Sequence, residues 1–251
     1  MRRLLPPAIV LAAAVALWEV ATAALHVSPE ILPGPVLVVT ATAGQIGPLL
    51  PNVATTSEEA LLGLALALAV AIPMAVAIDW STTVRASVYP LIVASQTLPI
   101  IVLAPLVVIW FGFGLGPKIV LVALFSFFPI AVGTVQGLAS ADVLIIDLLR
   151  TMRASRWQLL THVQLPSALP QIFTGLKISV TYAFTSAIVA EWVGASRGLG
   201  VFMTAAANDA PRQTDLVFGA TAVTAVLTIA LFGIVAALQR VAMPWRPRSR
   251  A

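Results

Sequence analysis

The chain has no cysteine and few charged residues. The absence of cysteine excludes disulfide bonds and thiolate metal sites. The two histidines, His26 and His162, lie far apart in the sequence and indicate no metal-binding pair. Charged residues make up 10% of the 251 residues, whereas soluble domains carry about 25%. Hydrophobic residues make up 60% and the mean hydropathy is +1.01, so we expect lipid to be the solvent for most of the chain.

The basic balance of the chain does not indicate nucleic-acid binding. The isoelectric point is near 10.3, but the formal net charge is only +4. The cations lie at the edges of apolar blocks rather than in a basic patch of the kind that nucleic acids require. We therefore expect a lipid bilayer, and no nucleic acid, among the partners of this chain.

The sequence also lacks the motifs of an ATPase and of an intramembrane enzyme. No GxxxxGK[ST] segment is present, so the chain cannot cradle ATP phosphates itself. An intramembrane protease needs a nucleophile with a base, or a metal. No serine has a histidine at a plausible membrane depth, and no acidic pair lies on one helix face within an apolar run. We therefore expect no catalytic residue, no metal site and no cofactor on this chain.

Charge-poor apolar runs predict six transmembrane helices, because a bilayer core needs about 20 apolar residues per helix. The runs lie at about residues 7–25, 60–78, 88–110, 119–138, 172–194 and 216–238. The first run could be read as a signal peptide, but five more apolar runs follow it rather than a soluble passenger. No repeat or linker divides the chain. The sequence therefore predicts an all-α membrane protein with one transmembrane domain, residues 1–251.

The distribution of Lys and Arg predicts how these helices are oriented. If both termini are inside, 11 of the 14 Lys and Arg residues lie on the cytoplasmic side. Cytoplasmic loops carry the excess of Lys and Arg. The sequence thus predicts a multi-pass protein with both termini in the cytoplasm, and it places the loop of residues 139–171 on the same side.

The cytoplasmic loop predicts a helix, a turn and a second helix. Ser140 or Asp142 can cap the first helix, "VLIIDLLRTM". Ser155 and Gln158 have the spacing of a capping box, in which each side chain bonds the other residue's backbone N–H. Pro166 is expected to end the second helix, because the residue before a proline avoids helical backbone angles.

Arginines recur every three residues in this loop, at Arg150, Arg153 and Arg156, beside an apolar side of the predicted helices. Two interpretations remain open on these grounds alone. The helix pair could lie on the inner membrane face, with its arginines at anionic lipid headgroups. Alternatively, it could dock on a cytoplasmic protein.

The loop resembles the coupling loop of bacterial ABC-importer permeases, whose pattern is E-A-A, three residues, G, nine residues, I, one residue, L-P. Asp147 begins the E-A-A position, Arg153 stands at the glycine, and "VQLP" matches the I-x-L-P end without a gap. An arginine with the positive φ of that turn would cost on the order of 1 kcal/mol. The residues expected to couple the chain to an ATPase are Asp147, Arg150, Arg153, Ala154, Ser155, Arg156, Trp157, Val163, Leu165 and Pro166.

The resemblance extends along most of the chain. The segments "ILPGPVLVV" (31–39), residues 89–138 and "AEWVGASRGLGVFM" (190–203) are similar to the nitrate, sulfonate and taurine branch. Within it, the chain most resembles permeases assigned to thiamine-precursor pyrimidines or riboflavin. The resemblance implies a type I importer fold in a bacterial inner membrane, an extracytoplasmic solute-binding protein, a second permease copy (a homodimer), and separate ATPase subunits that hold ATP and Mg²⁺.

A membrane subunit of this kind needs a polar path across the bilayer, and polar side chains within spans are costly unless they face a cavity or a partner helix. The expected path residues are Ser95, Gln96, Thr97, Tyr182, Thr185, Ser186 and Glu191. Ser and Thr in membrane helices often bond their own helix carbonyls, so Gln96 is the strongest candidate. Glu191 could instead reach the outer surface or pair with Arg197.

A different function stays open from the sequence. The chain could be a facilitator or a substrate-capture subunit that works without ATP. Such a protein would not need the gap-free coupling pattern.

Overall fold

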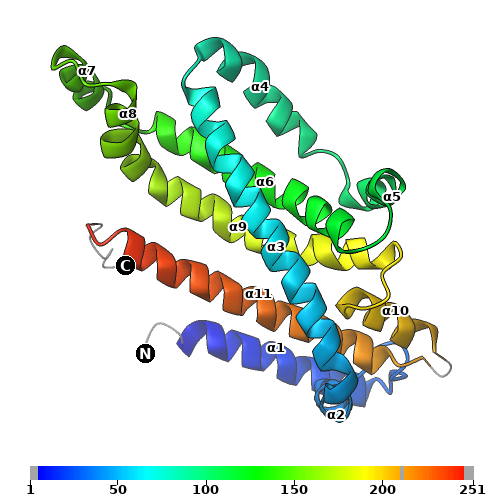
Figure 1. The fold of residues 1–251 in the computed structure, drawn as a ribbon. Coiled ribbons are helices and arrows are strands. Elements are labelled where there is room, and N and C mark those ends of the chain that lie inside the picture. The colour runs from blue at the N-terminus through cyan, green and yellow to red at the C-terminus, as the bar shows by residue number, and fades with distance from the viewer. Residues whose placement is uncertain (1–4, 210–211, 246–251) are drawn as a thin grey trace. The chain divides into compact units, whose positions relative to one another are not determined.

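A computed structural model describes residues 5–209 and 212–245, and within them it contains helices and no strand (Figure 1). The elements are α1 (Leu5–Ala24), α2 (Pro35–Gly44), α3 (Ile46–Asp79), α4 (Thr82–Ser95), α5 (Ile100–Phe111), α6 (Leu115–Ala139), α7 (Val143–Thr151), α8 (Arg156–Leu159), the π-helix η1 (Leu160–Gln164), α9 (Leu165–Trp192), α10 (Leu199–Asn208) and α11 (Thr214–Ala242). The predicted all-α fold class is confirmed. The chain divides into two compact units, Met1–Thr55 with Ser196–Val226, and Thr56–Ala195 with Leu227–Ala251.

The first unit contains two short helices that the apolar runs did not predict, α2 and α10. Each has 10 residues, which is too short to register as a span. Pro35 begins α2, at a position where its missing N–H costs nothing. The Glu19 carboxylate of α1 accepts a hydrogen bond from the Val36 N–H at 3.1 Å. A side chain of the first helix therefore caps the second one.

The second unit is built around α6 and α9, which pack at very short range. A Cβ atom on Gly133 of α6 would lie 2.7 Å from the Gln171 oxygen, and one on Gly175 of α9 would overlap the Pro129 carbonyl. The Ser179 hydroxyl donates to the Ser126 carbonyl across the two helices at 2.6 Å. Lipid tails are as apolar as leucine, so membrane helices associate through close backbone approach and hydrogen bonds of this kind.

Helix α3 turns a row of alanines inward and exposes several of its leucines. Ala67, Ala71 and Ala75 are fully buried in the core that α3 shares with α6 and α9. Leu62 and Leu66 are 43% and 40% exposed on the same helix. A water-soluble protein would have polar residues at the exposed positions. The prediction that lipid surrounds the helices is therefore consistent with this arrangement.

Within the described residues, four helices are long and apolar enough to cross a bilayer: Ile46–Asp79, Leu115–Ala139, Arg156–Trp192 and Thr214–Ala242. The pair Thr82–Ser95 and Ile100–Phe111 gives a fifth span if it is counted as one. The apolar part of α1, Ala8–Ala24, matches the predicted first span but is shorter than these.

The third predicted span, residues 88–110, is wrong as a continuous helix. Helices α4 and α5 meet at an angle of 102°. Pro99 has extended backbone angles, φ −66° and ψ 128°, and it lacks the N–H that an uninterrupted helix would need. Hydropathy does not distinguish Pro99 from Pro90 and Pro105, which lie in the same apolar run but inside α4 and α5.

The prediction that Pro166 ends the second helix of the loop is also wrong. Helix α8 continues through η1 into α9, and the whole run Arg156–Trp192 is helical over 37 residues. In η1 the Leu165 N–H bonds to the Leu160 carbonyl, five residues back. This wider π-turn leaves Pro166 in the first turn of α9, where a missing N–H is tolerated.

The contact between α6 and α9 gives a test of the fold. We expect Gly175→Ala to lower the thermal midpoint of the purified protein, because the added methyl group pushes the two backbones apart, an overpacking cost of about 1–3 kcal/mol. The matched control is Gly233→Ala within α11, where an added Cβ meets nothing within 4 Å. Both changes raise helix propensity equally, so equal midpoints for the two variants would contradict the close packing.

Candidate functional site

The loop predicted to couple the chain to another protein forms a helix, a turn and a helix, which we call the elbow: α7, residues 152–155 and α8. Asp142 caps α7, and its Oδ1 accepts from the Leu144 N–H at 2.8 Å. Asp147 and Arg150 form an ion pair at 3.3 Å on the same helix. Both side chains are mostly exposed, so the pair contributes no more than about 1 kcal/mol.

The turn of the elbow keeps the geometry of a glycine turn although an arginine occupies it. Arg153 has φ +62°. The Arg153 N–H bonds to the Arg150 carbonyl, and the Ala154 N–H bonds to the Leu149 carbonyl, both at 2.9 Å. These two bonds define a Schellman motif, which usually has glycine at the position of Arg153. The turn is therefore not reshaped, and the strain expected from the sequence, on the order of 1 kcal/mol, is present.

The second helix of the elbow begins with the predicted capping box. The Ser155 hydroxyl accepts from the Gln158 N–H at 3.3 Å, and the Gln158 side chain accepts from the Ser155 N–H at 2.7 Å. Gln164, one turn beyond α8, donates to Asp79 at the end of α3 at 2.8 Å. Trp157 packs edge-on against Trp80, with ring centres 5.2 Å apart. The elbow is thus attached to the end of α3.

The elbow leaves most of its surface uncovered. No residue of α7 is buried, and Leu144 and Met152 are 79% and 71% exposed. Of the predicted coupling residues, Asp147, Arg150, Arg153, Ser155, Arg156 and Trp157 are exposed, whereas Ala154, Val163, Leu165 and Pro166 are half-buried. The last three lie on η1 and α9, so the structure separates them from the exposed arginines. Exposed apolar residues beside arginines are typical of an interaction surface.

Two of the elbow arginines also line a groove. Arg150 and Arg156 line it with Trp80 and the Asp79 carboxylate, which accepts from Gln164, and its volume is about 320 Å³. Guanidinium groups bind carboxylate and phosphate through paired hydrogen bonds. The groove therefore has the chemistry to receive an acidic group.

The predicted path residues on α9 lie on two different faces. Tyr182 and Thr185 are exposed, and they continue a row that includes Thr181. Ser186 is fully buried, and its hydroxyl donates to the Tyr182 carbonyl. Glu191 is also buried, with 1% of its surface exposed. The face of α9 that is open in this structure therefore holds only the first two predicted residues.

Glu191 belongs to a buried polar cluster that the sequence did not reveal. Its Oε1 accepts from the Thr56 hydroxyl of α3 at 2.6 Å. One turn further along α3, Glu59 pairs with Lys118 of α6 at 2.6 Å, and Glu59 is 1% exposed. The expectation that Glu191 reaches the outer surface is wrong. The predicted apolar run at residues 60–78 stops just short of Glu59. Hydropathy does not show that α3 continues past this residue to Ile46.

The predicted path residues on the third span lie at its break. Ser95 ends α4, and its hydroxyl donates to the Ile92 carbonyl at 2.8 Å. Thr97 likewise donates to the Ala94 carbonyl at 2.8 Å. Gln96 is exposed, and its side-chain amide bonds to none of the residues that the structure describes. Gln96 is thus the polar side chain at this break that is free to meet a solute.

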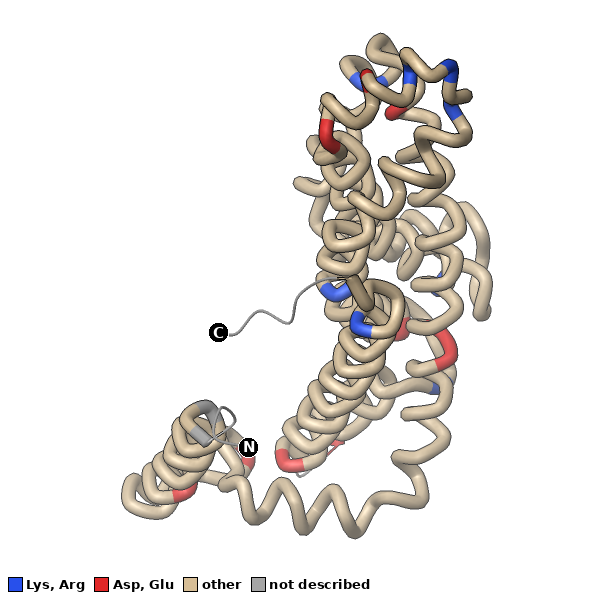
Figure 2. The backbone as a smooth tube through the Cα atoms, turned by 90° about the vertical axis from the view of Figure 1, so that its left-hand side faces the viewer, with Lys and Arg blue, Asp and Glu red and all other residues tan. Residues whose placement is uncertain are grey.

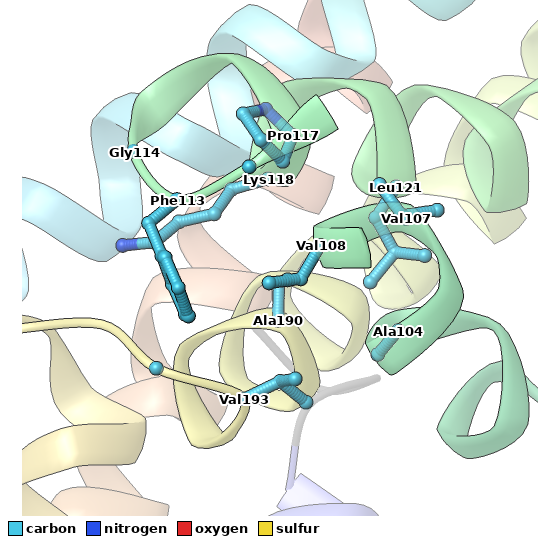
Figure 3. Close-up of a pocket in the computed structure, with 12 residues that line it drawn as sticks. Ala104, Val107, Val108, Phe113, Gly114, Pro117, Lys118, Leu121, Ala190 and Val193 are labelled. Atoms are coloured by element: carbon cyan, nitrogen blue, oxygen red, sulfur yellow. The ribbon is translucent and has the colours of Figure 1, made fainter. Parts of the chain in front are cut away.

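A pocket beside the second half of α5 is too small for a solute. It lies between α5, the start of α6 and the end of α9, and Val107, Leu121 and Val193 point toward it (Figure 3). Its volume is about 10 Å³, which is room for one water molecule at most. The described residues 5–209 and 212–245 also contain no cluster of three His, Cys, Asp or Glu side chains that could hold a metal.

Comparison with known proteins agrees with the elbow pattern. Residues 63–244 match the family of binding-protein-dependent transport system inner membrane components. The chain is 36% identical over 235 residues to the formylaminopyrimidine transport permease protein ThiX of Halalkalibacterium halodurans. The aligned region covers 92% of each chain. It is also 36% identical over 235 residues to the taurine transport system permease protein TauC of Escherichia coli, which covers 91% of this chain and 84% of TauC.

A solved structure shares the fold. A chain of an amino acid ABC transporter crystallised with histidines superposes with a TM-score of 0.65 and 16% identity, over 80% of this chain and 97% of that one. The type I importer fold expected from the sequence is therefore confirmed, and the relatives are transport permeases rather than enzymes. The chain belongs to the family of binding-protein-dependent transport system inner membrane components, the permease subunits of ABC importers.

Proposed function

We propose that two copies of this chain form the membrane path of an importer, and that each elbow docks on a cytoplasmic ATPase subunit that holds ATP and Mg²⁺. One observation carries the proposal: the second helix of the elbow and the open polar face of α9 belong to the same helical run, Arg156–Trp192. At 1.5 Å per residue, this run is about 55 Å long. A displacement of the elbow is thereby transmitted to Tyr182 and Thr185 without an intervening loop.

The cargo we propose is a small polar solute that an extracytoplasmic binding protein delivers. ThiX is named for formylaminopyrimidine and TauC for taurine. The solute of this chain is accordingly a thiamine-precursor pyrimidine, a riboflavin-like compound, or a sulfonate, taurine or nitrate type of anion.

The path we propose runs past the break between α4 and α5 and along the open face of α9. Interrupted membrane helices occur where the backbone lines a cavity or packs within protein. Gln96 at the break, with Ser95 and Thr97 beside it, and Tyr182 and Thr185 on α9 are the contacts. Ser186 and Glu191 can contribute only if their helices separate, because both are buried in this structure.

The orientation we propose puts the elbow and both termini in the cytoplasm. Figure 2 shows Lys, Arg, Asp and Glu positions gathered where the elbow lies. This agrees with the excess of cations expected on the cytoplasmic side.

Charge reversal on the elbow tests the docking. We expect Arg156→Glu to lower the amount of ATPase subunit that co-purifies with the permease by on the order of tenfold, because a like charge opposite an acidic partner group is repelled. Arg197→Glu is the matched control, since Arg197 is exposed and lies outside the elbow. Co-purification that is equal for the wild type and Arg156→Glu would count against docking at this surface.

The orientation can be measured directly, because the chain has no native cysteine. We expect Thr151→Cys in the elbow to react with a membrane-impermeant maleimide only in inside-out vesicles. Ser196→Cys should react only in right-side-out vesicles or intact spheroplasts. Labelling of Thr151→Cys from the outside would overturn the docking and the importer mechanism together.

The path is tested by removing the amide of Gln96. We expect Gln96→Leu to reduce ATP-driven uptake into reconstituted vesicles at least fivefold. A leucine cannot form hydrogen bonds with a polar solute that passes the break, whereas the Gln96 amide can. Assembly with the ATPase should stay intact. Leu98→Ala in the same turn serves as the control, and uptake by Gln96→Leu at the wild-type rate would remove Gln96 from the path.

A further inference from the structure

A lysine lies within the helical run of α9 without a carboxylate partner. Lys177 is half-buried, its Nζ donates to Gln239 Oε1 of α11, and it lies 5.5 Å from the centre of the Phe232 ring. Among the residues that the structure describes, the ion pairs are Lys118–Glu59 and Arg150–Asp147. An ammonium group has three N–H donors. The remaining donors of Lys177 therefore have no acceptor within the described chain.

Lys177 lines a cavity that is widely open to the surface and large enough for a small solute. The cavity has a volume of about 520 Å³, and small-molecule sites typically have about 300–1,000 Å³. Thr174, Thr181 and Tyr182 of α9 line it together with Phe232 of α11. Tyr182 is 46% exposed, and its hydroxyl donates to none of the residues in the described part of the chain. The Thr174 hydroxyl donates to the Pro170 carbonyl, so the cavity offers one cation, the hydroxyl groups of Thr181 and Tyr182, and two aromatic rings.

A lipid-facing surface does not explain this combination of residues. Ionisable side chains in membrane helices are rare, face a cavity or a bundle interior, and mark the routes of substrates and ions. The hydroxyl row on α9 continues the same face to Thr185. Lys177 therefore lies on the face of α9 that we have assigned to the path.

We propose that Lys177 binds an oxyanion of the imported solute, so that the cargo is a small organic anion or zwitterion, such as a sulfonate, and not a neutral pyrimidine. The inference rests on the proposed function, because it assumes that the open face of α9 lines the path. Lys177 supplies the charge, Tyr182 and Thr181 supply hydroxyl donors, and the Phe232 ring contacts the organic part. A compact ammonium group suits an oxyanion that must also be released.

The test measures binding by the complete permease–ATPase complex in phosphatidylcholine nanodiscs, with radiolabelled taurine as the sulfonate probe and radiolabelled cytosine as the neutral probe. We expect the wild type to bind taurine at millimolar concentration or below. Lys177→Met should weaken taurine binding at least tenfold, whereas Lys177→Arg, which keeps the charge, should stay within about threefold of the wild type. Arg240→Met is the matched control, because Arg240 is a neighbouring cation that does not line the cavity.

Each outcome decides the inference. Equal taurine binding by the wild type and Lys177→Met overturns it, as does the absence of taurine binding or preferential binding of cytosine by the wild type. A lipid phosphate has the same chemistry as a sulfonate, so binding is repeated in phosphatidylglycerol nanodiscs. The site would be assigned to a lipid headgroup by two results together. Taurine would be displaced in these nanodiscs, and phosphatidylglycerol would stay bound to the wild-type protein but not to Lys177→Met.

The proposed function fails by a separate measurement. If the binding protein does not stimulate ATP hydrolysis by the wild-type complex, the importer mechanism is wrong whatever Lys177 binds. If stimulation is intact and Lys177→Met binds taurine normally, only the oxyanion site is wrong.

Discussion

The second unit depends on one contact, the close approach of α6 and α9. In lipid, apolar side chains gain nothing from leaving the solvent, so helices must be held by backbone proximity and by hydrogen bonds. Glycines on both helices allow that proximity, and Ser126 and Ser179 bond to each other's backbone carbonyl groups. Helix α3 then packs its alanine face against the pair. Every other polar feature of this unit is positioned relative to these three helices.

The buried polar cluster shows how the same unit accommodates charge. Glu59 and Lys118 neutralise each other within hydrogen-bond distance, and Glu191 is bonded by the Thr56 hydroxyl. A buried ion pair offsets its own desolvation only in good geometry, and removal of one partner leaves an uncompensated charge. The cluster therefore ties α3, α6 and α9 together near one end, while η1 ties the run of α8 and α9 to α3 near the other, through Gln164 and Asp79.

The second helix of the elbow and the open polar face of α9 are two parts of one helical run, and the π-helix between them is what makes this possible. A proline at residue 166 in a regular helix would clash with the carbonyl four residues back. The wider turn of η1 avoids the clash and lets the helix continue. The same device keeps Lys177 and Tyr182 on one continuous helical run with Arg156.

Local signals in the sequence determined much of the protein. Hydropathy predicted α6 and α11 closely, the residue types at 142, 155 and 158 predicted the caps of the elbow, and the pattern around Arg153 predicted a strained turn. The caps and the turn depend on residues within a turn or two of one another, and the two spans depend on one uninterrupted stretch of chain. Only the tertiary structure decided that Glu191 is buried against a residue 135 positions away, that Glu59 meets Lys118, and that Lys177 faces a cavity. Burial and pairing of this kind depend on which helix faces pack together, and hydropathy, which sums over all faces of a helix, does not contain that information.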